Sequence, residues 1–267
     1  ALWAGSFDEV LVKLWAPMLL LSFAFSLYLF AAGKTTRLAA LGLVVMVVSS
    51  PFIALHGIEV YSDLAQGVFG FYAVLAMSEA ISGRKSFWAL TGLFLALTIF
   101  TKEEGLFFAA PFVLSALIFL LFRANPNSER RFRLFQFFAA LALIAPWLLF
   151  RIYFQLRVGS QGFSVQFHSD VPMQILRNLS TFTNFNVIIL FFPILVILNG
   201  KPGRELLHLL LPLLAYFLFF VVIYTFAGYY DWFIRGAVFH RNILTLFPAL
   251  CAVTVLLLRP LMLRKTQ

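Results

Sequence analysis

Charged side chains gather in three short segments that lie between apolar runs of the chain. The segments read YSDL at 61–64, TKEEG at 101–105 and FHRNIL at 239–244. A charge beside an apolar helix is costly unless it is solvated, paired or bound to a metal, so charges in such places point to function. Carboxylates there could accept protons, and Lys or Arg could bind an anion such as a phosphate.

Asp63 stands directly before an apolar run, where we expect the N-terminus of a helix. The helix dipole stabilises a carboxylate at that end. Glu59 lies one turn earlier and could share a cation with Asp63, which makes Asp63 a candidate ligand for a divalent metal ion. The alternative is that Asp63 only caps the helix near the membrane interface, while Glu59 is solvated.

The TKEEG turn carries an ammonium group and two carboxylates, on Lys102, Glu103 and Glu104. It joins two apolar segments of nearly minimal spanning length, so it should lie close to the lipid head groups. Lys suits a phosphate because its ammonium is a point charge on a flexible stem. The alternative is an ordinary polar hairpin between two helices.

His240 and Arg241 precede the last apolar run. A guanidinium at a helix N-terminus adds to the free backbone N–H donors, and together they form an anion site. The aromatic residues just upstream could stack on a sugar, but an interfacial belt is the commoner role for aromatics at this depth; they are Tyr229, Tyr230 and Trp232.

The composition indicates a membrane protein. Of the 267 residues, 62% are hydrophobic and 12% are charged, and the chain holds 34 Phe and one Cys. A soluble domain cannot bury that much apolar surface, a disordered chain lacks it, and a single cysteine excludes a disulfide framework. The net charge of +9 does not indicate a nucleic-acid partner, because the basic residues form short clusters between apolar runs.

These runs predict an all-α, polytopic integral membrane helix bundle of about nine transmembrane helices, at about 20 residues for each span. The expected spans are Leu14–Ala32, Leu38–Leu55, Leu64–Ile81, Ser86–Phe100, Leu106–Phe122, Leu134–Phe154, Phe185–Leu198, Leu206–Phe226 and Ile243–Leu258.

Alternating these spans across a bilayer sorts the charges. Of the 20 basic residues, 13 fall on one side and 7 on the other, whereas the 11 acidic residues divide 3 and 8. Basic loops stay cytoplasmic, so we expect the N-terminus outside and the C-terminus inside. The three charged segments then share the outer face. Motifs for nucleotide phosphates, dinucleotides, zinc and serine hydrolysis are missing from the sequence.

The order of the segments resembles a known family. The pieces are GSFDEVLVKLWAPMLLL, the YSDL turn, GLFLALTIFTKEEGL and HRNILTLFP. Together they resemble the polytopic GT-C glycosyltransferases, in the bacterial and archaeal branch near the protein mannosyltransferases and the aminoarabinose transferases.

The resemblance implies a glycosyltransferase of the cytoplasmic membrane. Such an enzyme moves a sugar from a polyprenyl-phosphate donor to a lipid, glycan or protein acceptor at the outer face, usually with inversion. Asp63 and Glu104 match catalytic acidic positions. The donor phosphate would bind Lys102, Arg241 and His240. Further substrate contacts are expected at these residues: Glu59, Tyr61, Asp231 and Arg235.

In the family pattern the main catalytic carboxylate lies in the first outer loop. Asp8 and Glu9 resemble the segment after that loop. The resemblance therefore implies that residues 1–267 form a single transmembrane domain that is a fragment lacking the first helix and first outer loop.

Two other functions stay open, a secondary transporter and a non-catalytic polytopic membrane subunit. Transporters often carry ionisable groups at mid-membrane and two related halves. Here the charges cluster at the ends of spans. The position of Asp63 discriminates, because a transporter would hold it at mid-bilayer and the enzyme at the outer end.

Overall fold

The computed structural model describes residues 14–58, 62–102, 104–122, 127–154, 166–180, 188–200, 203–226 and 237–263. No strand occurs in these ranges. The elements are α2 Trp15–Ala32, α3 Arg37–Val48, α4 Pro51–His56, α5 Ser62–Ile81, α6 Phe87–Thr101, α7 Gly105–Phe122, α8 Asn127–Leu141, the 3-10 turn Ala142–Ile144, α9 Ala145–Tyr153, α10 Val171–Ser180, α11 Ile188–Leu198, α12 Arg204–Phe226 and α14 Ala237–Leu263.

The predicted all-α membrane bundle is confirmed as a helical fold with apolar helices, but the count of nine spans is not. Within the described ranges, six helices are long and apolar enough to cross a membrane. They are Trp15–Ala32, Ser62–Ile81, Gly105–Phe122, Glu129–Tyr153, Glu205–Phe226 and Phe239–Pro260.

The other three expected spans correspond to helices that are shorter than these six. The expected span Leu38–Leu55 divides at Pro51 into α3 and α4, because a residue before proline disfavours the helical conformation. The helices α6 and α11 have 15 and 11 residues. At 1.5 Å per residue, 15 residues extend about 22 Å, which is less than a hydrocarbon layer of about 30 Å.

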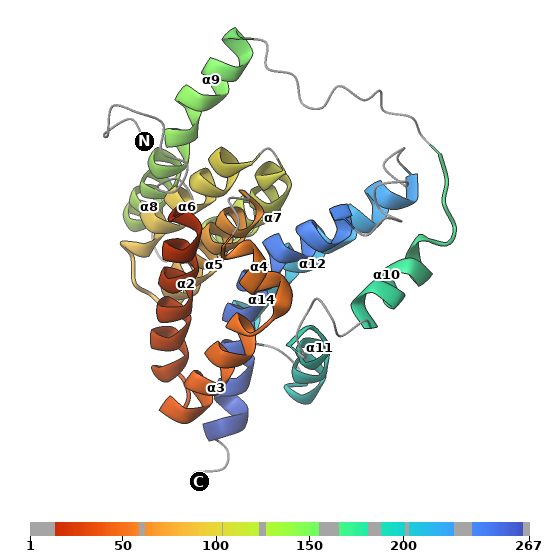
Figure 1. Ribbon diagram of the computed structural model, residues 1–267. Coiled ribbons are helices and arrows are strands. Elements are labelled where there is room, and N and C mark those ends of the chain that lie inside the picture. The colour runs from red at the N-terminus through yellow and green to blue at the C-terminus, as the bar shows by residue number, and fades with distance from the viewer. Residues whose placement is uncertain are drawn as a thin grey trace.

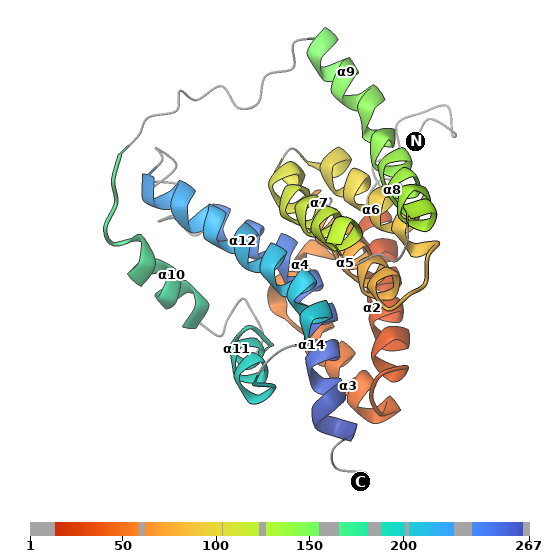
Figure 2. The ribbon, with the colours of Figure 1, turned by 180° about the vertical axis from the view of Figure 1, so that it is seen from behind.

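The helices α5 and α14 form the centre of the bundle. In each, 78% of the apolar window is buried, against 11% in Glu129–Tyr153. Figure 1 shows α2, α6, α7 and α12 around this pair, and Figure 2 shows the same arrangement from behind. In both views α9 projects beyond the bundle, and α10 and α11 lie on the side of α12 and α14 away from α8.

A glycine allows α5 and α14 to approach each other closely. A Cβ on Gly67 would lie 2.8 Å from the carbonyl oxygen of Leu244 and 3.1 Å from Cγ of Pro248. Small residues let membrane helices pack backbone against backbone, where van der Waals contact is the main attraction. Gly67 lies about one turn from Asp63, and Leu244 about one turn from Arg241, so this contact positions the ends of the two helices.

Ion pairs occupy the opposite end of α5. Glu79, in the last turn of α5, lies 3.4 Å from Nζ of Lys34 and 3.3 Å from Nε of Arg84. Glu129 of α8 pairs with Lys85 and, at 2.9 Å, with Arg133. These cations belong to the basic segments that the sequence assigned to one side of the membrane, while Asp63 lies at the other end of the helix.

The substitution Gly67→Ala should destabilise the fold, because the methyl group would force α5 and α14 apart. We expect a loss of roughly 1–3 kcal/mol of unfolding free energy, as for overpacked cores. Gly42→Ala is the matched control, since nothing lies within 4 Å of a Cβ there. Thermal unfolding in lipid nanodiscs measures both, and equal midpoints for the two variants would contradict the close contact.

Candidate functional site

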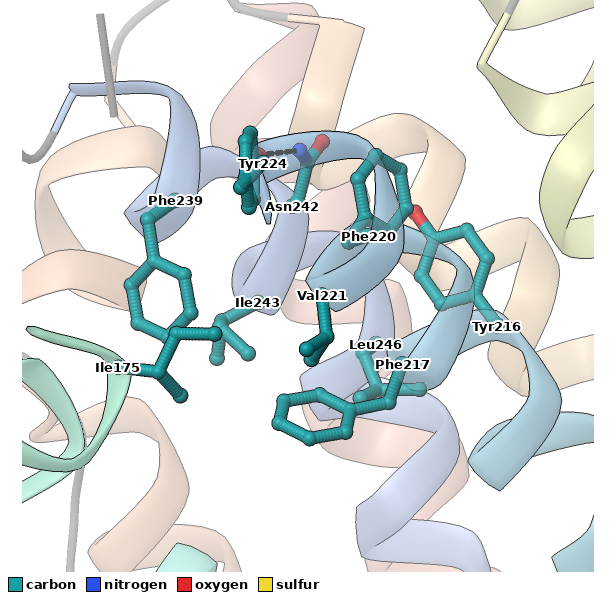
Figure 3. Close-up of a pocket in the computed structure, with 10 residues that line it drawn as sticks. All are labelled: Ile175, Tyr216, Phe217, Phe220, Val221, Tyr224, Phe239, Asn242, Ile243 and Leu246. Carbon is teal, nitrogen blue, oxygen red and sulfur yellow. Dashed lines mark hydrogen bonds between the residues drawn. The ribbon is translucent and has the colours of Figure 1, made fainter. Parts of the chain in front are cut away.

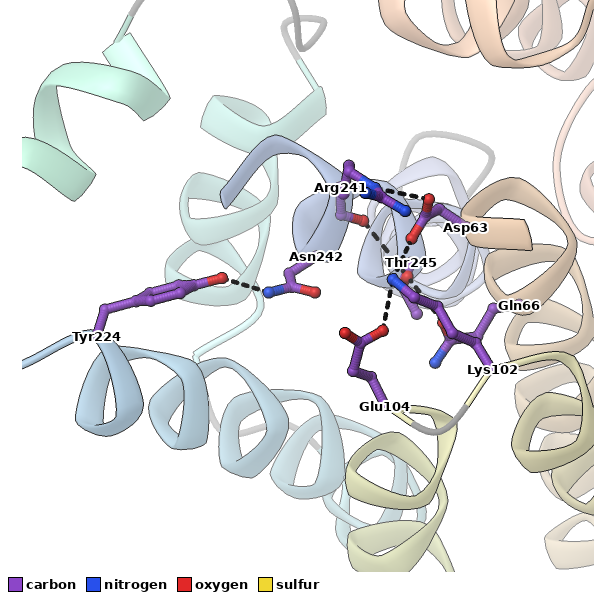
Figure 4. A network of polar contacts seen from close by, with 8 residues as sticks. All are labelled: Asp63, Gln66, Lys102, Glu104, Tyr224, Arg241, Asn242 and Thr245. Carbon is purple, nitrogen blue, oxygen red and sulfur yellow. Dashed lines mark hydrogen bonds and ion pairs between the residues drawn. The ribbon is translucent and has the colours of Figure 1, made fainter. Parts of the chain in front are cut away.

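A fully buried carboxylate lies at one end of the bundle. Asp63, in the first turn of α5, has 0% of its surface exposed. Its Oδ1 accepts a hydrogen bond from Nζ of Lys102 at 2.7 Å, and its Oδ2 accepts one from Nε of Arg241 at 2.8 Å. Both oxygens of this carboxylate are thus bonded to cations that come from other parts of the chain (Figure 4).

The local sequence positions each of these groups at a helix end. Lys102 ends α6 with an extended backbone, at φ −159° and ψ 146°, and α7 begins three residues later. The turn is tight, since a Cβ on Gly105 would lie 2.1 Å from the carbonyl oxygen of Thr98. Any other residue at 105 would push the turn outward, and Lys102 with it.

Lys102 bridges two carboxylates. Its Nζ lies 2.5 Å from Oε2 of Glu104 as well as 2.7 Å from Asp63. The cluster of Asp63, Lys102, Glu104 and Arg241 therefore holds two positive and two negative charges. Compensation of this kind is what allows a carboxylate to lie in a membrane domain, because an unpaired buried charge costs several kcal/mol.

The members of the ion cluster differ in their exposure. The exposed side-chain fractions are 0% for Asp63, 22% for Lys102, 39% for Glu104 and 40% for Arg241. A ligand can therefore reach Glu104 and the two cations, while Asp63 stays covered. The accessible carboxylate for chemistry is Glu104, and Asp63 is the group that holds the two cations in place.

A second polar layer lies between α5, α12 and α14. The Thr245 hydroxyl is 3.5 Å from Oε1 of Gln66, and Nδ2 of Asn242 donates to the hydroxyl of Tyr224. All four side chains are buried. The sequence analysis did not single them out, although polar residues inside apolar helices were the available signal, and three of them lie within one turn of Asp63 or Arg241.

A narrow cavity borders this layer. It lies between α10, α12 and α14, with Tyr224 and Asn242 at one end and Ile175, Phe217 and other apolar side chains around it (Figure 3). The space open to water is about 10 Å³, roughly what one water molecule needs. A cavity of this size does not admit a substrate.

The structure brings four of the predicted site residues together, namely Asp63, Lys102, Glu104 and Arg241. His240, next to Arg241, lies elsewhere: its ring centroid is 5.8 Å from that of Phe52 and 5.9 Å from that of Phe239. Its predicted role in phosphate binding stays a prediction. Four other predicted contacts lie outside the described residues, as do the three upstream aromatics: Glu59, Tyr61, Asp231, Arg235, Tyr229, Tyr230 and Trp232.

The predicted metal role of Asp63 does not fit its contacts. A divalent ion on this fully buried carboxylate would be repelled by Lys102 and Arg241, since each oxygen already pairs with one of them. Across the part of the chain that the structure describes, no three His, Cys, Asp or Glu side chains come close enough to hold a metal ion.

The fold and the site together define an all-helical, multi-pass membrane protein with a charge-compensated ion cluster at one end of its bundle. Comparison of the chain with protein-family models, curated proteins and solved structures finds no match. The resemblance to GT-C glycosyltransferases therefore stays an inference from the residues.

Asp63→Asn should destabilise the protein more than Glu104→Gln. The first change leaves two cations without their shared buried partner, and we expect it to lower the unfolding free energy by roughly 2–3 kcal/mol. The second removes one partly exposed contact of Lys102, and we expect it to lower the unfolding free energy by about 1 kcal/mol or less. Thermal or denaturant unfolding in nanodiscs compares the two, and an equal loss would show that Asp63 does not organise the cluster.

Proposed function

We propose that this protein is a membrane glycosyltransferase of the GT-C type, which transfers a sugar from a polyprenyl-phosphate donor to a lipid, glycan or protein acceptor. The observation that carries the proposal is the pair of cations, Lys102 and Arg241, that Asp63 holds together at one end of the bundle. A lipid-linked donor presents its phosphate at the head-group level, which is also where the ends of spanning helices lie.

The two cations would bind the phosphate of the donor. Lys102 is 22% exposed and Arg241 40% exposed, so an anion can approach both without unfolding the cluster. The two cations repel each other, and their attraction to the shared carboxylate of Asp63 offsets this repulsion. In transfer, the C–O bond between the sugar and the phosphate breaks, and the cations stabilise the charge that develops on the leaving phosphate.

Glu104 would accept the proton of the acceptor. The acceptor oxygen attacks the anomeric carbon as the phosphate leaves, and its proton passes to a nearby carboxylate. Glu104 is 39% exposed and 2.5 Å from Lys102, so it can reach a group beside the phosphate. Asp63 is a positioning residue in this proposal, because both its oxygens are bonded to cations and no surface of it meets solvent.

The position of Asp63 favours the enzyme over the alternative of a secondary transporter. The carboxylate lies in the first turn of its helix, not at the middle of the span. The paired charges at the far end, around Glu79 and Glu129, also lie at helix ends. A non-catalytic subunit would have no need of a partly exposed carboxylate paired with Lys102.

We also propose the orientation in the cytoplasmic membrane. The ion cluster faces outward, the end with Glu79 and Arg84 faces the cytoplasm, the N-terminus lies outside and the C-terminus inside. The support is the charge distribution of the loops, since basic loops are retained in the cytoplasm.

Lys102→Met and Arg241→Gln should each lower sugar transfer at least about 100-fold, as for loss of one group that stabilises developing charge. Lys85→Met is the matched control, because Lys85 also pairs with a glutamate but at the other end of the bundle. The assay follows transfer from a polyprenyl-phosphate sugar by the full-length protein in nanodiscs. If Asp63→Asn and Arg241→Gln both leave transfer unchanged, the site is wrongly assigned.

Cysteine labelling should confirm the orientation. In a Cys251→Ala background, Ile58→Cys lies five residues before Asp63 and Ser82→Cys three residues after Glu79, and both positions are exposed. A membrane-impermeant maleimide added to intact cells, with any outer membrane removed, should label position 58 alone. Permeabilised cells should show both labels, and the reverse pattern in intact cells would invert the proposed topology.

A further inference from the structure

Beside the ion cluster lies an open recess that the sequence did not indicate. It is lined by Phe100, Thr101, Lys102, Glu104 and Trp147, with a volume of about 380 Å³. Ligand pockets in proteins span about 300–1,000 Å³, so the recess has room for one small ring. The lining residues come from the end of α6, the turn before α7, and α9.

The lining of the recess combines two kinds of side chain. The first are aromatic rings: the ring centroids of Phe100 and Trp147 are 5.2 Å apart at 64°, and Phe150, outside the lining, stacks on Trp147 at 5.7 Å with 13° between the planes. The second is the ion pair of Lys102 and Glu104, 2.5 Å apart. These contacts hold the indole of Trp147 against its neighbours and so make it a firm surface.

We propose that this recess binds the ring of a sugar, with one face of the ring on Trp147 and hydroxyl groups on Lys102 and Glu104. A sugar ring has an apolar C–H face, which can pack on Trp147, and a rim of hydroxyl groups, which can bond to Lys102 and Glu104. Aromatic side chains supply contact area, and charged groups form the stronger hydrogen bonds to hydroxyls.

Two other ligands fit less well. A prenyl chain needs an apolar lining throughout, whereas the ammonium and carboxylate here would lose solvation without gaining a partner. A phosphate would favour both cations, but Arg241 does not line the recess. The recess is therefore on the Glu104 side of the ion cluster, next to the phosphate position rather than at it.

This inference rests on the proposed function, and it extends it to a subsite with Trp147 as a binding residue. The sugar could be that of the donor or that of a glycan acceptor, because both present the same ring chemistry. In either case Glu104 would lie beside the reacting sugar, whereas Arg241 lies next to Asp63; Figure 4 shows Glu104 and Asp63 both joined to Lys102, and Arg241 joined to Asp63.

The test is saturation-transfer NMR on the full chain in nanodiscs free of glycoside detergent. The probes are the methyl glycosides of glucose, galactose, mannose and arabinose. At least one should receive saturation on its ring C–H protons. Trp147→Ala should weaken its binding at least about fivefold, whereas Trp147→Phe, which keeps an aromatic face, should stay within about threefold.

Trp15→Ala is the matched control, since Trp15 is an exposed tryptophan of α2 that does not line the recess, and it should change nothing. Glu104→Gln offers a second variant, with weaker binding expected. A farnesyl-phosphoryl sugar that displaces the glycoside identifies the donor's sugar as the ligand, and a glycoside that stays bound identifies the acceptor's.

The subsite is refuted if no glycoside binds, or if Trp147→Ala binds as the parent protein does. Its failure is distinguishable from that of the proposed function. Loss of transfer in Lys102→Met with unchanged binding in Trp147→Ala would reject only the subsite. Binding that depends on Trp147, with transfer unaffected by Lys102→Met, would reject only the proposed phosphate site.

Discussion

The burial of the Asp63 carboxylate constrains the end of the bundle where α5, α6 and α14 meet. An unpaired carboxylate inside a membrane domain costs several kcal/mol, so the fold is stable only if cations reach it. Here the cations come from two other elements, Lys102 after α6 and Arg241 in α14. Lys102 is 39 residues after Asp63, and Arg241 is 178 residues after it, so the two ion pairs hold three distant parts of the chain at one point. The ends of α5, α6 and α14 cannot slide past one another without breaking a charge-assisted hydrogen bond.

Backbone packing makes that constraint achievable. Gly67 brings the α5 backbone against Leu244, and Gly105 brings the α7 start against Thr98. Gly67 is four residues after Asp63, and Gly105 is three residues after Lys102. A helix turns about 100° for each residue, so an error of one residue in register would carry Asp63 or Arg241 to another face. Close approach and ion pairing therefore select the same arrangement of helices.

The four charges of the cluster balance one another, and its members differ in exposure; the proposed chemistry depends on both properties. A compensated set of four charges can remain at the edge of a membrane without a large desolvation cost. Since Asp63 is covered while Glu104 and Arg241 are about two-fifths exposed, the carboxylate that organises the site differs from the one that a ligand would meet. An incoming phosphate would exchange partners with Glu104 and water instead of taking the place of Asp63. The recess beside Trp147 lies on the Glu104 side, where the sugar next to such a phosphate would lie.

The sequence by itself determined the helical membrane bundle and the end at which the charges gather. Apolar runs predict where helices lie, and the predicted alternation of spans assigned Asp63, Lys102, Glu104 and Arg241 to one side; the structure brings these four residues together. Only the tertiary structure decided that Lys102 bridges two carboxylates, that both oxygens of Asp63 are taken, and that Trp147 of α9 stands beside the cluster. It also shortened the apolar run at 38–55 into α3 and α4. The reason is that hydropathy is a local property along the chain, whereas the lateral neighbours of a helix depend on side-chain packing between segments that are far apart in sequence.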